Sequence, residues 1–172
     1  MLKRLGREDF DDIFKIMDDS FPEDEYRPYE GQKALFCRTE YSVYGAVEES
    51  ETAGFISVWE FEEFAYIEHF AVDSRFRNGG RGKEMLQELL RNIDKPFVLE
   101  VEPPETEITE RRIGFYNRNG FAFNDYDYIQ LPMWEGRNPV PLKIMSYPEA
   151  LSQTDFEKVR DTIYREVFGV EI

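Results

Sequence analysis

The chain has 172 residues, with one cysteine, Cys37, and one histidine, His69, and its 36 acidic and 21 basic side chains give a net charge of −15. A single cysteine and a single histidine exclude an internal disulfide, a Cys-x-x-Cys pair and any multi-histidine metal site, so we expect no metal. The negative charge argues against general binding of nucleic acids, and the sequence shows neither an apolar signal core nor an apolar run of the roughly 18 residues that span a membrane.

A chain of this length usually folds as one domain. We therefore expect a single domain over residues 1–172, in a cytoplasmic protein, with a C-terminal helix at 154–168 as an appended element. The sequence predicts no particular oligomeric state.

The first 72 residues predict two helices and then three strands. Asp9 is placed to cap a helix that ends at Phe21-Pro22, and a short helix is expected from about 32 to 37. Strand-like stretches follow at 41–47, 54–61 and 65–72. Because the connections between them are short, the three strands are expected to be antiparallel neighbours.

The remaining residues alternate between strands and helices. Apolar residues recur at helical spacing from Met85 to Ile93, and a strand at 97–101 follows, an order that predicts a parallel pair with strand 65–72. A helix from about 109 to 118 is expected to end at Asn119-Gly120, followed by strands at 121–131 and 141–147. Thr154-Asp155 is expected to cap the last helix. The sequence therefore predicts a mixed α+β fold.

The segment between strand 65–72 and the next helix is rich in glycine and arginine. From residue 72 it reads VDSRFRNGGRGK. A Gly-rich turn from a strand into a helix exposes backbone N–H groups at the positive end of the helix dipole, where phosphate groups bind. Four cations in this turn face one acid, Asp73, and this local reversal of sign suggests an anionic ligand. The glycine spacing fits neither a Walker loop nor the dinucleotide fingerprint, which disfavours a nucleotide-phosphate enzyme.

The pattern Arg-x-x-Gly-x-Gly at 77–82, directly after Phe70-Ala-Val-Asp73, resembles the turn with which the GCN5-related N-acetyltransferase (GNAT) superfamily holds the diphosphate of acetyl-coenzyme A. Phe115-Tyr116 and Gly120-Phe121 resemble a second stretch of that family, and the order of elements from 1 to about 147 matches it. The resemblance implies a mostly antiparallel sheet that is splayed at the middle and flanked by helices. It also implies an acetyl-CoA-dependent N-acetyltransferase that transfers acetyl directly to a primary amine of a small molecule, peptide or protein.

The resemblance also implies roles for individual residues. The backbone of Phe70, Ala71 and Val72 would bind the pantetheine arm of the coenzyme, and Tyr116 would donate a proton to the departing thiolate. Core packing beside Phe115 and Phe121 is the alternative for Tyr116. The turn residues that would hold the diphosphate are Arg77, Asn78, Gly79, Gly80, Arg81, Gly82 and Lys83.

Glu68 is the first candidate for the base that deprotonates the amine, directly or through a water. The two-residue period of a strand places Glu68 on one face with Tyr66 and Phe70, and His69 on the other. An acid inside an apolar strand is costly to bury without a purpose. Two alternatives stay open: Glu68 pairs with an arginine or faces solvent, and His69 becomes the base if a bulge breaks the alternation.

The remaining candidates have weaker signals. The acidic surface suggests a cationic acceptor such as a polyamine, an aminoglycoside or a basic protein terminus. For most of the aromatic residues Tyr126, Tyr128 and Trp134 core packing is favoured over an acceptor pocket, and Cys37 is interpreted as a structural thiol. Arg112 is expected to be solvated, and the alternatives are contacts with coenzyme phosphates or with a carboxylate such as Glu100 or Glu102. The alternative function is a non-catalytic acyl-CoA-binding or regulatory module with the same fold.

Overall fold

The structure is a computed structural model that describes residues 1–48, 50–77 and 79–171. Within these residues it confirms the predicted mixed α+β fold, with seven strands whose neighbours are mostly antiparallel. The strands are β1 (Leu2–Leu5), β2 (Tyr41–Glu48), β3 (Glu51–Glu60), β4 (Ala65–Val72), β5 (Phe97–Val101), β6 (Ala122–Gln130) and β7 (Val140–Tyr147). The α-helices are α1 (Phe10–Ser20), α2 (Tyr29–Ala34), α3 (Arg81–Asn92), α4 (Glu107–Arg118) and α5 (Gln153–Glu166), and the short 3₁₀ helices are η1 (Arg7–Asp9), η2 (Glu23–Glu25), η3 (Leu35–Cys37) and η4 (Ser74–Phe76).

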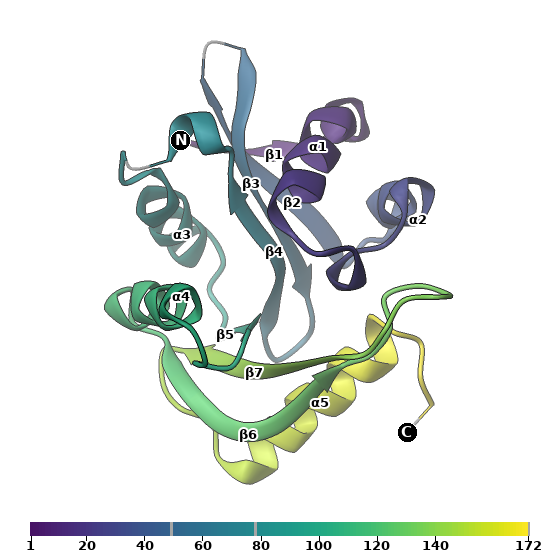
Figure 1. The fold of residues 1–172 in the computed structure, drawn as a ribbon, viewed down its shortest axis with the longest axis vertical. Coiled ribbons are helices and arrows are strands. Elements are labelled where there is room, and N and C mark those ends of the chain that lie inside the picture. Colours follow the sequence, from purple (N-terminus) through teal and green to yellow (C-terminus); the bar gives the residue numbers. More distant parts are fainter. Residues whose placement is uncertain (49, 78, 172) are drawn as a thin grey trace. The chain divides into compact units, whose positions relative to one another are not determined.

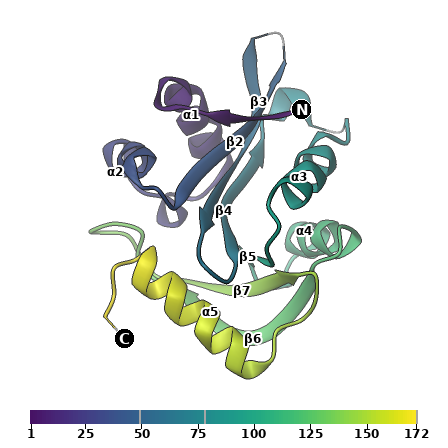
Figure 2. The same ribbon diagram turned by 180° about the vertical axis from the view of Figure 1, so that it is seen from behind.

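The chain divides into two compact units, Met1–Phe97 and Val98–Ile172. In the first unit, four antiparallel strands follow the order β1-β2-β3-β4. Figures 1 and 2 show α1 and α2 on one face of these strands and α3 on the other. Phe10 and Met17 of α1 and Leu86 and Leu89 of α3 are buried, because each helix turns its apolar stripe towards the sheet.

The N-terminal elements differ in detail from the prediction. β1 was not predicted, because its four residues carry only a weak strand pattern and gain their order from pairing with β2, with Leu2 opposite Ala46. Asp9 is the N-cap residue of α1, as predicted, but its side chain makes no capping hydrogen bond to the helix. Asp9 already has helical backbone angles because η1 leads into α1, and its carboxylate accepts a hydrogen bond from the Gly6 N–H at 2.8 Å instead.

The second unit holds β5, β7 and β6 in this order, together with α4 and α5. β6 and β7 are antiparallel, and Figures 1 and 2 show α4 and α5 on opposite sides of them. The last helix docks on β6 of its own chain, where Tyr126 stacks on Phe156 with ring centroids 4.6 Å apart. Its predicted cap was wrong, because Ser152 is the last extended residue and its hydroxyl accepts from the Asp155 N–H at 3.2 Å.

No helix among the described residues combines the length and the apolar character needed to cross a membrane.

Candidate active site

The Gly-rich turn leads from the end of β4 into α3. Asp73 caps η4 by accepting a hydrogen bond from the Arg75 N–H at 2.9 Å, and Gly80 precedes α3 with φ +76°. Side chains disfavour this left-handed conformation, so glycine suits the abrupt entry into the helix. The amides of the first turn of α3 have no acceptor within the helix and lie at its positive end. This geometry suits an anion, as the sequence predicted.

Open space surrounds the backbone of this turn. A Cβ atom built on Gly79 or on Gly80 would meet no other atom within 4 Å. A ligand can therefore approach the main chain closely at both residues, and the turn fits the diphosphate of a coenzyme. Asn78, which was predicted to bind the coenzyme, lies outside the described residues.

The cations of the turn are partly neutralised by Asp73 of the turn itself and by two glutamates that are distant in sequence. Arg75 pairs with Asp73 at 2.9 Å and with Glu51 at 2.6 Å, and Arg81 pairs with Glu48. Hydrogen bonds from Arg75 lower the pKa of Asp73, and the same acids raise the pKa of Arg75. Both glutamates belong to the β2–β3 hairpin. The local excess of positive charge is thus smaller than the sequence of the turn indicated.

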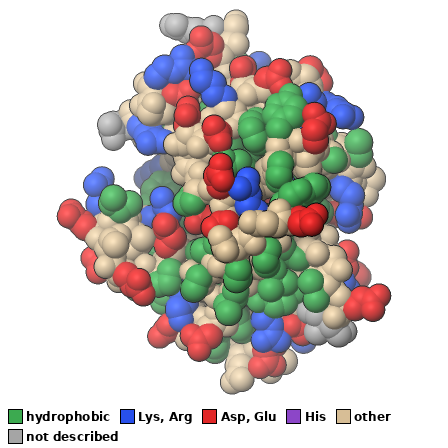
Figure 3. All heavy atoms as spheres, turned by 45° about the vertical axis from the view of Figure 1, so that its right-hand side comes forward, with side chains coloured by type: hydrophobic (Ala, Val, Ile, Leu, Met, Phe, Trp, Pro, Cys, Tyr) green, Lys and Arg blue, Asp and Glu red, His purple; other side chains and the backbone are tan. Residues whose placement is uncertain are grey.

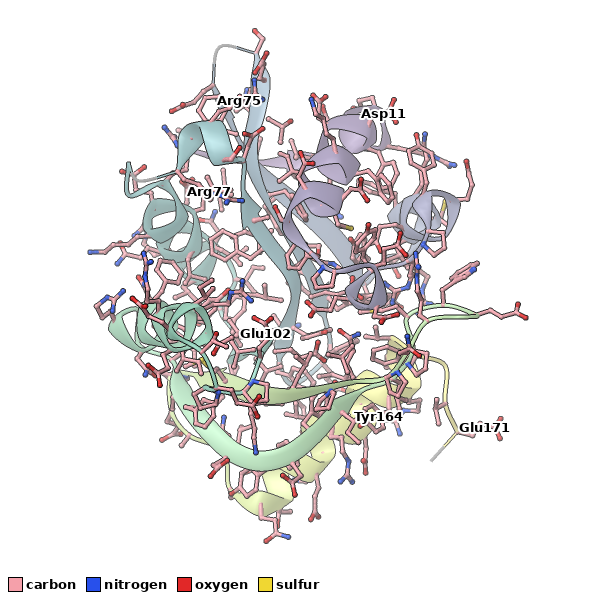
Figure 4. The ribbon with its side chains drawn as sticks, in the orientation of Figure 1. Asp11, Arg75, Arg77, Glu102, Tyr164 and Glu171 are labelled. Carbon is pink, nitrogen blue, oxygen red and sulfur yellow. The ribbon has the colours of Figure 1, made fainter. Side chains whose placement is uncertain are left out.

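Arg77 has a different partner in the backbone. Its Nε donates a hydrogen bond to the carbonyl oxygen of Val72 at 2.9 Å, so it ties the turn to the end of β4 (Figure 4). The three β4 residues that were predicted to bind pantetheine pair with β3 along one edge: Phe70 with Ile56, Ala71 with Phe55 and Val72 with Gly54.

A pocket of about 330 Å³ lies beside the turn. Its charged groups are the carboxylates of Asp19 and Asp73 and the guanidinium of Arg77. The pocket can therefore accept a cationic group and an anionic group close together. Its full lining is Ile16, Asp19, Ser20, Asp73, Ser74 and Arg77.

A bulge in β4 changes the direction of the predicted base. Ser57 of β3 pairs with His69 and the next residue, Val58, pairs with Ile67, so Glu68 is the extra residue on β4. The predicted alternation of Glu68 and His69 on opposite faces was wrong for this reason. Oε2 of Glu68 lies 3.5 Å from Nδ1 of His69, and both side chains are buried.

Glu68 forms a buried ion pair. Its Oε1 accepts a hydrogen bond from Nη1 of Arg27 at 2.8 Å, and 0% of its side chain is exposed. Burial acts to raise the pKa of Glu68, but the charge of Arg27 and a contact with His69 outweigh burial and lower the pKa to about 2. This arginine partner corresponds to one alternative that the sequence left open. The base role stays a prediction.

Besides its contact with Glu68, His69 has polar contacts with Glu25 and Ser57. Nε2 lies 2.8 Å from the carbonyl oxygen of Glu25, and since a carbonyl only accepts, Nε2 carries the hydrogen. Ser57 Oγ accepts from the His69 main-chain N–H at 3.0 Å and lies 3.4 Å from Nδ1. The nitrogen Nε2 is therefore occupied and not available to accept a proton from a substrate.

The second unit contains the predicted proton donor. Tyr116 lies on α4 and is 8% exposed, with its ring edge-on to Phe115 and Phe121. Burial raises the pKa of Tyr116 to about 12, against a smaller lowering effect of Arg112. The phenol is therefore protonated at neutral pH. Left-handed Gly120 ends α4 as predicted, with φ +91°.

The other candidates have structural partners or lie at the surface. Tyr128 is buried and donates a hydrogen bond to Glu100, whereas Trp134 is 48% exposed. Arg112 is exposed, as expected, and also pairs with Glu102, one of the carboxylate partners that the sequence left open (Figure 4). Cys37 lies exposed on η3. Among the described residues, no group of three or more His, Cys, Asp or Glu side chains could hold a metal ion.

Sequence reasoning missed two features of this site. It did not identify Arg27 as the partner of Glu68, 41 residues away, nor the hairpin acids as partners of the turn. One feature of the sequence could have indicated Arg27 as a charge partner, because it is a lone cation in the acidic stretch EDEYRPYE.

Comparison with known proteins gives the family. The model of the acetyltransferase (GNAT) family matches residues 10–121, which is more than half of the chain. A chain of known structure from Bacteroides thetaiotaomicron, ascribed to the GNAT acetyltransferases, is 34% identical, covers 99% of each chain and has a TM-score of 0.91. No curated protein matches the sequence.

Two more distant structures show the same fold. The ribosomal-protein-S18-alanine N-acetyltransferase from Escherichia coli is 19% identical, with a TM-score of 0.66 over 88% of this chain and 95% of that chain. NAA60 from Arabidopsis thaliana, solved with a bisubstrate analogue, is 16% identical, with a TM-score of 0.66 over 86% of this chain and 96% of that chain. Taken with the family match over residues 10–121 and the Gly-rich turn within it, these findings confirm that the chain belongs to the GNAT acetyltransferase family.

Proposed function

We propose that this acetyltransferase is an acetyl-CoA-dependent N-acetyltransferase that transfers the acetyl group directly to a primary amine. The Gly-rich turn carries this proposal. Its open backbone at Gly79 and Gly80, at the positive end of α3, suits the diphosphate of the coenzyme.

Different groups of the turn and of β4 would bind different parts of the coenzyme. The main-chain amides of 79–83 would donate hydrogen bonds to the diphosphate, and Arg77, fixed by the Val72 carbonyl, would add positive charge beside it. Arg81 and Lys83 would contribute further charge from the first turn of α3. Bound acetyl-CoA supplies the thioester, and the main chain of Phe70 to Val72 would align the pantetheine arm.

A cationic amine loses two protons on the way to the amide, one before it attacks the thioester and one afterwards. Tyr116 would donate a proton to the departing thiolate, since its buried phenol is protonated at neutral pH, and the second proton of the amine would restore the phenol. The first proton must leave the ammonium group for water or a base. A carboxylate with a pKa of about 2 and no exposed surface is a weak base and can reach an amine only through water, so we assign no direct contact between Glu68 and the amine.

The acceptor that fits best is a cationic amine. The chain has a net charge of −15, and Asp19 and Asp73 line the pocket beside the turn. Figure 3 shows acidic side chains spread over the face in view among basic and apolar ones. An ammonium group is attracted to such a surface before it is deprotonated at the site.

Transfer to a defined set of amines tests the proposal. Purified protein is incubated with acetyl-CoA and a polyamine, an aminoglycoside, or a peptide with an N-terminal alanine, the residue named for the E. coli structure. We expect release of the coenzyme thiol together with an acetylated product in mass spectra. Tight binding of acetyl-CoA without turnover on any amine would favour a non-catalytic acyl-CoA-binding module, and no binding would contradict both functions.

A further inference from the structure

Residues 21–28 join α1 to α2 and form the α1–α2 segment. Buried polar groups attach this segment to β4. Arg27 is bound by Glu68, and the Glu25 carbonyl accepts a hydrogen bond from His69 at 2.8 Å. The ring of Phe21 meets the His69 ring edge-on, with centroids 5.0 Å apart. Two consecutive residues of β4 thus contact the same segment.

The bulge makes this double attachment possible. In a regular strand, Glu68 and His69 would point to opposite faces. The extra residue at the bulge breaks the alternation, and both side chains reach the α1–α2 segment. The bulge therefore allows two consecutive residues of β4 to bind the α1–α2 segment.

Arg27 is fixed on its other side as well. Oε1 of Gln32 lies 3.4 Å from the Arg27 main-chain nitrogen and 3.5 Å from Nη1, and the Gln32 amide nitrogen donates to the Tyr41 hydroxyl at 3.2 Å. The Arg27 side chain is only 6% exposed. A buried guanidinium needs a negative partner, because a buried charge without compensation is strongly destabilising. Glu68 supplies that charge.

The segment continues directly into one wall of the pocket. Asp19 and Ser20 form the last turn of α1 and line the pocket, and Phe21 is the next residue. A shift of the segment would move this wall and the carboxylate of Asp19 with it.

We propose that Glu68 is a positioning residue. It serves as the buried counter-ion of Arg27 and so holds the α1–α2 segment and the adjoining wall of the pocket beside the Gly-rich turn, instead of taking a proton from the amine. The predicted effect of Glu68 on the KM of the amine rests on the proposed N-acetyltransferase function. The predicted attachment of the α1–α2 segment by Glu68 does not depend on that function.

A cycle of four proteins separates the two roles: the wild type, Glu68→Gln, Arg27→Met and the double variant. Either single change removes one charge of the buried Glu68–Arg27 pair and keeps the other, whereas the double variant removes both charges and keeps similar side-chain volumes. If Glu68 acts by positioning, the double variant should behave like the wild type. If Glu68 acts as the base, Glu68→Gln and the double variant should lose activity equally, because both lack the carboxylate.

The expected results follow from this logic. Each single variant should melt about 10 °C below the wild type, and the double variant within about 3 °C of it. Glu68→Gln should raise the KM of the amine about tenfold with kcat within about threefold of the wild type, and the double variant should restore the KM. If kcat falls about 100-fold or more in both proteins that lack the carboxylate, and the acidic limb of the pH profile disappears, the positioning role is overturned.

Two further readouts keep the test decisive. If Glu68→Gln does not fold, kcat of the double variant distinguishes the two roles, because that protein also lacks the carboxylate. A kcat close to that of the wild type supports positioning, and a fall of about 100-fold supports a base. If the wild type transfers acetyl to no amine, the proposed function fails by itself, and limited proteolysis still tests the attachment. The α1–α2 segment should be cut faster in both single variants than in the wild type and the double variant, and equal cutting in all four would overturn the attachment.

Discussion

Arg75 donates a hydrogen bond to the carboxylate of Glu51 at 2.6 Å, and this contact joins the Gly-rich turn to the β2–β3 hairpin. Arg81 is joined to the same hairpin through Glu48. The hairpin therefore places two acids beside the turn that is proposed to hold the coenzyme diphosphate. In the proposed function, the coenzyme diphosphate and Glu48 would compete for the guanidinium group of Arg81, and Glu51 would add negative charge beside the same turn.

Removing a hairpin charge should strengthen coenzyme binding. Glu51→Gln frees Arg75 from one of its two acidic partners and lowers the negative potential beside the turn. Since exposed ion pairs are worth about 0–1 kcal/mol, we expect acetyl-CoA to bind about two- to fivefold more tightly, with a smaller difference at high salt. Calorimetry measures the change.

Glu63→Gln is the matched control, because it removes one exposed acid of the same unit outside the hairpin. An equal gain in the control would assign the effect to net charge. Weaker binding of acetyl-CoA by Glu51→Gln would mean that Glu51 orients Arg75 for the coenzyme and does not compete with it.

Tyr116→Phe tests the proton donor. The substitution keeps the ring that packs against Phe115 and Phe121 and removes the hydroxyl. We expect kcat to fall about 100-fold while the KM for acetyl-CoA changes less than about threefold, since the proton is needed only as the thiolate departs. Steady-state kinetics on the amine with the highest turnover provide the measurement.

Tyr126→Phe removes a phenol from the same unit, where it contacts α5, and should leave kcat unchanged. If Tyr116→Phe also retains full kcat, the role of Tyr116 is core packing.

The buried ion pair predicts a pH dependence of stability. The pKa of Glu68 lies at about 2 in the folded protein, below its ordinary value of 4.5. The unfolded chain therefore binds this proton at higher pH, and the stabilisation is complete above about pH 4.5 and is lost as the pH falls towards 2. Over that range the free energy of unfolding should decrease with a slope approaching 1.4 kcal/mol per pH unit from this group.

Denaturant titrations between about pH 2 and pH 6 measure this slope. The Arg27→Met/Glu68→Gln double variant lacks both charges and should show a shallower slope. Identical slopes in the wild type and the double variant would show that Glu68 is not stabilised as a carboxylate in the folded protein.

The last helix offers a test of its N-terminus. Ser152 accepts a hydrogen bond from the Asp155 amide, so Ser152→Ala should lower the free energy of unfolding by about 1 kcal/mol. Thr154 is an exposed residue of the first turn, and Thr154→Ala should change the stability by less than about 0.5 kcal/mol. Thermal unfolding of both variants distinguishes the two caps, and a larger loss at Thr154 would contradict the structure.

The predictions from sequence were accurate where local pattern decides the structure. β5 occurs at the predicted residues 97–101, because an apolar run lies between Lys95-Pro96 and the turn at Pro103-Pro104. α3 follows the helical spacing from Met85 onwards, and left-handed Gly120 ends α4. In each case the signals lie within a few residues of the element.

The predictions failed where distant residues decide. β1 depends on pairing with β2, about 40 residues away, and the direction of Glu68 depends on a bulge that forms only when β3 and β4 pair. The charge of the Gly-rich turn was misjudged for the same reason, because Glu48 and Glu51 reach it through the fold. A sequence pattern gives the residues of a site, whereas their charge partners depend on tertiary contacts.

Binding of acetyl-CoA to Gly79→Ala, compared with the wild type by calorimetry, tests the central claim most directly. A Cβ at Gly79 would meet no protein atom within 4 Å, so the variant should fold with an unchanged melting temperature, and the added methyl group would occupy space that the diphosphate needs. We predict acetyl-CoA binding in the wild type and at least about tenfold weaker binding in Gly79→Ala. Equal affinity in the two proteins, or no binding to the wild type, would contradict a diphosphate held by the backbone of this turn.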